Sequence, residues 1–143
     1  MNQTNKIPIP QGKYMPAVRA GDLVYTSGMT PRRAGMLIME GKVRTSEPID
    51  TYKEATILAA HNGLVAIQNL LHPGEKIVQI LSMTIYIAAE EGFELHTQLG
   101  DFASEYLLKE LGSGGIGSRA VVGVYTLPKN APLEIQLVAL VTT

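Results

Sequence analysis

The sequence predicts an α+β fold in which two amphipathic helices pack on one face of a mostly antiparallel sheet. Two segments, residues 51–71 and 93–111, carry apolar residues at spacings of three and four, the period of a helix. Two others, Ile77–Ala88 and Leu133–Val141, largely alternate apolar and polar residues, the period of a strand. No internal repeat and no interdomain linker interrupts the 143 residues, a length that fits one domain spanning residues 1–143.

The N-terminal part predicts an extended arm and a short hairpin. Residues 1–13 contain two prolines that disfavour helix, so we expect an arm there. Two β-rich runs, 14–20 and 23–27, flank a Gly-Asp pair that is typical of a hairpin turn. Residues 28–41 combine proline and glycine with two arginines and predict a loop, with a brief strand at 36–39.

The first predicted helix runs from Thr51 to about Leu71. Asp50 precedes it and is the expected N-cap, because its carboxylate can accept hydrogen bonds from the N–H groups of the first turn. The sequence His72-Pro73-Gly74 ends the helix. One apolar stripe recurs at helical spacing: Ile57, Ala60, Leu64, Ile67 and Leu71.

The long strand Ile77–Ala88 is expected to bury one face. Strict alternation places five apolar residues together, with Gln79 as the exception: Ile77, Leu81, Met83, Ile85 and Ile87. The other face then carries Ser82, Thr84 and Tyr86.

The C-terminal part predicts a second helix followed by a hairpin. The helix, residues 93–111, is expected to bury one apolar side: Phe93, Leu99, Phe102, Ala103, Tyr106, Leu107 and Leu111. Gly112–Gly117 is predicted as a flexible connector. The β-rich runs Ser118–Tyr125 and Leu133–Val141 flank a proline-containing turn at 127–132, which predicts that they form a hairpin.

Composition narrows the function classes. The net charge is −1 with no basic run, which argues against nucleic-acid binding, because neutralised phosphates supply much of that affinity. The chain has no cysteine, which excludes disulfides, thiolate metal sites and a cysteine nucleophile. No stretch has the apolar length of a signal peptide or a membrane helix, so we expect a cytoplasmic protein without a membrane partner. Only 17% of residues are charged, which favours an oligomer.

Three patterns that often carry chemistry are weak in this sequence. The glycines of 112–117 follow a helix and lack the Lys-Ser/Thr ending of a phosphate-binding loop. His61, His72 and His96 do not share the spacing of metal ligands on one helix face, so no metal site is expected. The serines show no nucleophile elbow, which argues against a Ser-His-Asp hydrolase.

Two charged residues stand in otherwise apolar strands, Arg119 and Glu134. Arg119 opens its strand directly after the glycines, where a guanidinium can point into a cleft at the end of the sheet and bind a carboxylate through two hydrogen bonds. Glu134 follows the turn at 127–132, so the two residues could flank one hairpin. An ordinary strand-edge charge and a structural ion pair are the alternatives, and the local pattern leaves them open.

Two parts of the chain resemble the YjgF/Rid family of reactive-intermediate (imine) deaminases, also described as L-PSP endoribonuclease-like. The opening part is Gly12–Val18 with Ala20–Gly28, and the closing part is Ser118–Val124 with Leu127–Ile135. The match spans nearly the whole chain in the right order. The closing part, with an arginine and a glutamate at a fixed separation, is the more specific.

The resemblance implies a chorismate-mutase-like fold and a homotrimer with its sheets packed inward and a cleft between each pair of neighbours. It implies hydrolytic deamination of small enamine or imine acids such as 2-aminoacrylate, which releases ammonia and a keto acid. Arg119 would bind the carboxylate of this small partner molecule, and Glu134 would hold or activate the attacking water. Tyr14 and Ser27 would line the pocket. No cofactor, metal or organic, is implied.

Some residues depart from the family pattern. Asp101 stands at a pocket position where Asn is common, and its carboxylate would repel an acidic substrate unless it is protonated, paired or turned away. Val121 replaces a common Cys, and Met29 stands where Gln is common. Since these changes leave Arg119 in place, the alternative is a non-catalytic module that binds a small carboxylate metabolite in the same cleft. Ribonuclease and chorismate-mutase-type activities are less favoured, because the charge is near neutral and the cations are few.

Overall fold

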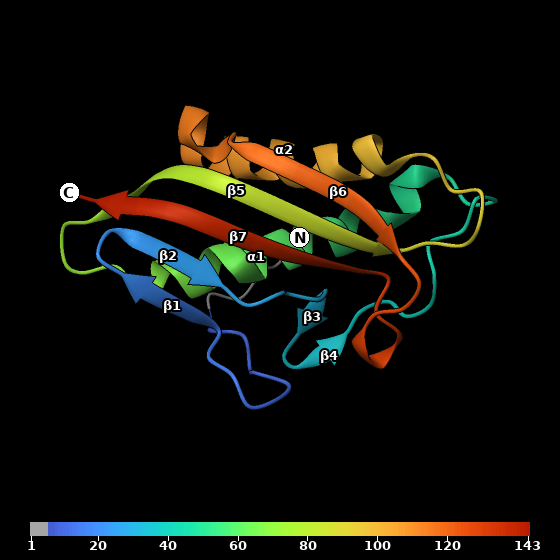
Figure 1. Cartoon of the computed structure of the whole chain (residues 1–143), viewed down its shortest axis with the longest axis horizontal. Helices are drawn as coiled ribbons and strands as arrows, with labels where there is room; N and C mark the ends of the chain where they lie inside the picture. Colours follow the sequence, from blue (N-terminus) through green and yellow to red (C-terminus); the bar gives the residue numbers. More distant parts are fainter. Residues whose placement is uncertain (1–5) are drawn as a thin grey trace.

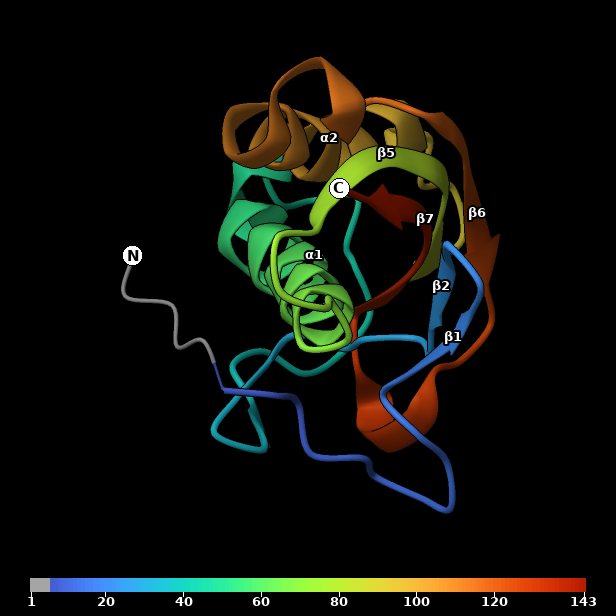
Figure 2. The same ribbon diagram turned by 90° about the vertical axis from the view of Figure 1, so that its left-hand side faces the viewer.

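The computed structural model describes residues 6–143 and forms one five-stranded mixed sheet with two helices on one side (Figures 1 and 2). The predicted α+β class is therefore confirmed. The strands of the sheet are β1 (Ala17–Ala20), β2 (Leu23–Thr26), β5 (Lys76–Ala88), β6 (Ser118–Val124) and β7 (Leu133–Thr142), and the helices are α1 (Lys53–Gln68) and α2 (His96–Leu111). A small separate ribbon pairs β3 (Arg32–Arg33) with β4 (Met36–Leu37).

The sheet order is β1-β2-β7-β5-β6, which corrects the predicted C-terminal hairpin. β5 lies between β6 and β7 and pairs with both, parallel to β6 and antiparallel to β7 (Figure 1). The turn at 127–132 therefore carries the chain across one strand instead of joining neighbours. The turn signal does not predict a hairpin correctly here, because β5, the longest strand, lies between β6 and β7 and forms backbone hydrogen bonds with both.

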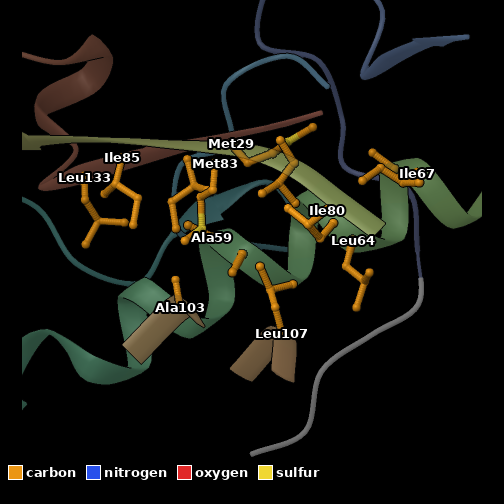
Figure 3. Packing of buried hydrophobic residues seen from close by; sticks show 14 of the residues in the cluster. Met29, Ala59, Leu64, Ile67, Ile80, Met83, Ile85, Ala103, Leu107 and Leu133 are labelled. Atoms are coloured by element: carbon orange, nitrogen blue, oxygen red, sulfur yellow. The ribbon is translucent and has the colours of Figure 1, made fainter. Parts of the chain in front are cut away.

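Irregular pairing changes which side chains β5 buries. Register shifts against β7 occur between Ile77 and Gln79 and between Ile80 and Ser82. Ile80 is consequently buried and Leu81 is 38% exposed, so the predicted inward position of Leu81 is wrong. From Met83 onward the alternation holds, and Figure 3 shows Met83 and Ile85 among the packed core residues. An extra unpaired residue inverts the faces that strict alternation assigns.

Helix α1 begins later than predicted. A 3₁₀ turn, Ile49–Tyr52, contains Asp50, and the N-cap of α1 is Tyr52, without a side-chain capping hydrogen bond. The N-cap role expected for Asp50 is therefore wrong. The helix is buried on nearly every side from Ala55 to Ile67, because it packs against β7 on one side and α2 on another. Figure 2 shows it on the concave side of the sheet.

The glycines after α2 are packed rather than flexible. Gly112–Gly115 forms a 3₁₀ turn, and the following residues lie directly against β5. A Cβ at Gly117 would lie 1.8 Å from the carbonyl oxygen of Ile80, and one at Gly114 would lie 2.2 Å from that of Val78. Glycine is required here because backbone approaches backbone. No helix among residues 6–143 is both long enough and apolar enough to cross a membrane.

One ion pair joins the N-terminal hairpin to the end of α1. Arg19 on β1 binds Glu75 through both terminal nitrogens, at 2.6 and 2.8 Å, and donates to the carbonyl oxygen of Leu70 at 2.9 Å. The hydrogen bond from Arg19 and the one from the His72 backbone lower the pKa of Glu75 to about 2. These contacts hold β1 against the turn between α1 and β5.

Candidate functional site

Arg119 on β6 points toward helix α2. Its neighbours on the same face of the strand, Val121 and Gly123, also face this helix. The helix approaches closely at Gly100, where an added Cβ would lie 2.8 Å from Val121 Cγ2 and 3.3 Å from Arg119 Cζ. Gly100 thus opens the space that the guanidinium occupies.

The guanidinium of Arg119 is held by α2. One terminal nitrogen lies 2.8 Å from the Asp101 carboxylate and donates to the Ser104 hydroxyl at 2.8 Å. The other donates to the carbonyl oxygen of Thr97 at 3.3 Å. The sequence predicts that Asp101 would repel an acidic substrate unless its carboxylate is protonated, paired or turned away. In the structure the carboxylate is paired with Arg119.

The Arg119 site still has donor capacity. A guanidinium carries five N–H groups, and Nε makes no hydrogen bond to any residue from 6 to 143. The side chain is 23% exposed and that of Asp101 is 53% exposed, so the pair lies at the surface. An anion can therefore approach the Nε edge without displacing Asp101, although Asp101 cancels much of the positive charge.

Glu134 lies on the opposite face of the sheet. Its neighbours on β7, Leu133 and Ile135, are fully buried on the helix side, so Glu134 points away from the helices. Its carboxylate packs on Gly28, where an added Cβ would lie 2.2 Å from Oε2. Burial raises the pKa of Glu134. A carboxyl group with a raised pKa can both donate and accept a proton near neutral pH more readily than an ordinary glutamate.

Arg119 and Glu134 do not meet within one chain. Arg119 pairs with Met83 and Glu134 with Tyr86, on opposite edges of β5, and the two side chains face opposite sides of the sheet. The expectation that they flank one hairpin is therefore wrong. A site that contains both requires a second copy of the chain.

Tyr14 shares a pocket lining with Gly28, which Ser27 directly precedes, and neither Tyr14 nor Ser27 is among the hydrogen-bonding partners of Arg119. The Ser27 hydroxyl donates to the carbonyl oxygen of Met15 at 2.6 Å, and its N–H donates to that of Pro16 at 2.9 Å. Ser27 thus fastens the arm to the end of β2. The Tyr14 hydroxyl accepts a hydrogen bond from the Gln11 N–H at 3.0 Å.

Tyr14 also lines a pocket that sequence reasoning missed. The pocket has a volume of about 170 Å³ and lies between the N-terminal arm, the segment after β2, and α1. Gly28 and Met29 contribute to its wall, together with Arg32 and Asn62. Arg32 stands in a stretch rich in Gly and Pro, and only the structure shows that this loop folds back over α1.

A partly buried pair of polar residues lies between the helices. Nδ1 of His61 on α1 is 2.6 Å from the Tyr106 hydroxyl of α2, and burial raises the pKa of Tyr106 to about 12. Within residues 6–143, no three His, Asp or Glu side chains gather as metal ligands do. The pair joins the two helices.

Comparisons with known proteins agree on one family. The endoribonuclease L-PSP family model matches residues 4–141. A RutC family protein of Aquifex aeolicus (strain VF5) is 30% identical over 138 residues, which cover 96% of this chain and 95% of that protein. A 2-iminobutanoate/2-iminopropanoate deaminase of Dermatophagoides farinae is 28% identical over 134 residues, covering 94% and 90%.

Solved structures share the fold. A protein of unknown function from Agrobacterium tumefaciens superimposes with a TM-score of 0.85 at 27% identity, covering 95% of this chain and 86% of that one. The YjgF gene product of E. coli superimposes with a TM-score of 0.69 at 20% identity, covering 96% and 95%. The first pair matches in both fold and sequence, and the second in fold alone.

Proposed function

Because the chain belongs to the YjgF/Rid (endoribonuclease L-PSP) family, we propose that it hydrolyses small enamine or imine acids to keto acids and ammonia. Water adds to the C=N carbon, the C–N bond breaks, and nitrogen leaves as ammonia. The relative from Dermatophagoides farinae, named as an imine deaminase, supports this class of reaction.

In this proposal Arg119 anchors the substrate and Glu134 moves the proton. The Nε edge of Arg119 binds the substrate carboxylate, which fixes the imine carbon beside a water. Glu134 takes a proton from that water and returns one to the departing nitrogen. The raised pKa of Glu134 supports this role, since a carboxyl group must hold a proton for part of the cycle.

The site would form between two copies of the chain in a homotrimer. The sheet face opposite the helices is not covered by any of residues 6–143 and is mixed in character: Val18, Tyr25 and Val122 are between 42% and 57% exposed, while β7 between them carries the exposed Gln136. Exposed apolar residues on an uncovered sheet face favour an interface. If three sheets pack inward, Arg119 of one copy and Glu134 of its neighbour can meet at the rim, as the family resemblance implies.

The single observation that carries the proposal is the half-buried carboxyl of Glu134 against Gly28. The test follows pyruvate and ammonia as purified protein is added to 2-aminoacrylate generated in situ. R119A and E134Q should each lower the enzymatic rate by about 100-fold or more. The exposed residues Arg44 and Glu94 give matched controls, R44A and E94Q, that should retain the wild-type rate. An R119A protein as fast as the wild type would refute the assignment.

The Arg119–Asp101 ion pair favours a second candidate function, the non-catalytic binding of a small carboxylate metabolite in the same cleft. Asp101 neutralises much of the charge of Arg119, which favours weak, reversible binding of a carboxylate. Binding without turnover also requires no proton transfer by Glu134. This candidate predicts that a carboxylate such as 2-oxobutanoate binds the wild type and not R119A, while no imine is turned over. Turnover that depends on Glu134 would exclude it.

A further inference from the structure

The pocket beside Tyr14 combines apolar walls with positive charge. Ile7, Ile9 and Met29 supply apolar surface, and the arm closes over one side of the space. Its lining includes two cationic side chains, Lys6 and Arg32, and no acidic one. The volume of about 170 Å³ equals roughly five or six water molecules at about 30 Å³ each.

The Arg32 guanidinium lines this pocket without an ion pair to any of residues 6–143. Its Nε donates to the Thr30 hydroxyl at 3.2 Å, and one terminal nitrogen donates to the carbonyl oxygen of Gly35 at 2.8 Å. These bonds fix the direction of the guanidinium across the β3–β4 ribbon. Within residues 6–143, Arg32 forms no ion pair, and its second terminal nitrogen makes no hydrogen bond.

The contrast with neighbouring arginines is informative. Arg19 is paired with Glu75, Arg33 with Glu54 and Arg119 with Asp101. Arg32 lies next to Arg33 on the same short strand. Arg32, however, faces the pocket and forms no ion pair with a carboxylate among residues 6–143. Partial burial of a cation without a counter-ion is costly, and an anion bound from outside would offset that cost.

We propose that this pocket is a binding site for a short monocarboxylic acid with an apolar body of about three to five carbons. The carboxylate lies on the unused edge of Arg32 and the apolar body contacts Ile7, Ile9 and Met29. Inorganic phosphate is disfavoured, because the apolar walls cannot replace its hydration. The site does not include Arg119 or Glu134, but it shares Tyr14 with the residues expected in the deaminase pocket. Gly28 lines it and also contacts Glu134, which places the bound acid next to that residue.

The first test measures binding of butanoate and pentanoate to the whole chain by calorimetry. Loss of a hydrogen-bonded charge should weaken binding by about 10-fold or more in R32Q. R33Q is the matched control, because it removes the adjacent guanidinium that does not line the pocket, and it should bind within about twofold of the wild type. These comparisons are made in the R119A background, so that a carboxylate bound at Arg119 does not contribute to the measured affinity. Butanamide, which has the same shape without the charge, should bind at least about 10-fold more weakly than butanoate.

A second measurement uses the wild type alone and does not depend on the folding of any variant. In NMR spectra, the methyl group of bound butanoate should show contacts with the methyl groups of Ile7, Ile9 and Met29. The proposal is overturned if no such contacts appear at saturating butanoate. Equal binding of butanamide, equal binding by R32Q, or a preference for inorganic phosphate would also overturn it.

Discussion

At the scale of single residues, the neighbours of each charge decide its role. Arg119 and Glu134 are both charges in apolar strands, and the sequence treats them alike. The structure gives Arg119 three hydrogen-bonding partners on α2, whereas Glu134 packs its carboxylate against the backbone of Gly28. One group is therefore balanced, and the other is destabilised in its charged form.

The raised pKa of Glu134 predicts a specific pH dependence of stability. Below about pH 4.5 the carboxyl is protonated in both folded and unfolded chains, and its favourable burial is fully present. As pH rises through the raised folded pKa, the folded state must bury a charge and loses that stability. E134Q, which cannot ionise, should thus gain stability relative to the wild type between pH 4 and pH 8, measured by urea unfolding. An unchanged difference across this range would contradict the burial of the carboxyl.

The Glu75 carboxylate predicts the opposite sign. Its pKa is lowered to about 2, mainly by the hydrogen bond from Arg19, so its contribution is present above about pH 4.5 and is lost as pH falls toward 2. The midpoint of thermal unfolding should be higher in the wild type than in E75Q at pH 6. The two midpoints should converge near pH 2. If the difference between the two midpoints did not change with pH, the charge of Glu75 would make no contribution to stability.

At the scale of elements, close backbone approach matters more than chain flexibility. Gly117 lies directly before β6 and faces the carbonyl of Ile80, next to the irregular pairing of β5. Gly100 plays a related part on α2, because it lets the helix lie on Val121 and Arg119. Glycines therefore position the segments beside Arg119, because a residue with a side chain would not fit at these close approaches.

Gly117→Ala should destabilise the chain strongly. The added methyl group would lie 1.8 Å from a backbone oxygen that cannot rotate away, so either β6 or β5 must shift. We expect a loss of about 3 kcal/mol or more in the free energy of unfolding, the upper range for overpacking. S113A, at an exposed position of the same turn, should change it by less than about 0.5 kcal/mol. A G117A protein as stable as S113A would contradict the close approach.

Sequence patterns predict elements well and their pairing less well. The periodicity of 51–71 and 93–111 identifies both helices; burial on one side explains the pattern of α2, whereas α1 is buried on nearly every side. Leu81 and the order of β6 and β7 could not be predicted, because a bulge and a strand inserted between sequence neighbours leave no local signal. The partner of Arg119 on α2 is likewise a long-range contact. The pocket at Arg32 depends on how a loop folds back, which no local pattern specifies.

At the scale of the whole molecule, one face of the sheet remains open. Both helices cover the other face (Figure 2), and the open face carries apolar side chains from several strands. On this account, the face is the contact between copies. Because Arg119 and Glu134 lie on opposite sides of the sheet, a site that contains both then requires assembly of two copies.

The oligomeric state should depend on this face. Light scattering should give a mass three times that of the 15.4 kDa chain. Val138→Lys places a charge in the middle of the open face and should shift the protein to monomers, because an unpaired lysine is poorly tolerated in an apolar interface. L108K, on the exposed side of α2, should leave the mass unchanged. A monomeric wild type would contradict the proposed assembly.

The most direct measurement mixes two inactive variants, R119A and E134Q, by joint refolding at equal amounts. If each site takes Arg119 from one copy and Glu134 from its neighbour, about a quarter of the sites in random trimers contain both residues. Deamination of 2-aminoacrylate should then return to about a quarter of the wild-type rate. A mixture as inactive as its two components, alongside an active wild type, would contradict a site shared between copies.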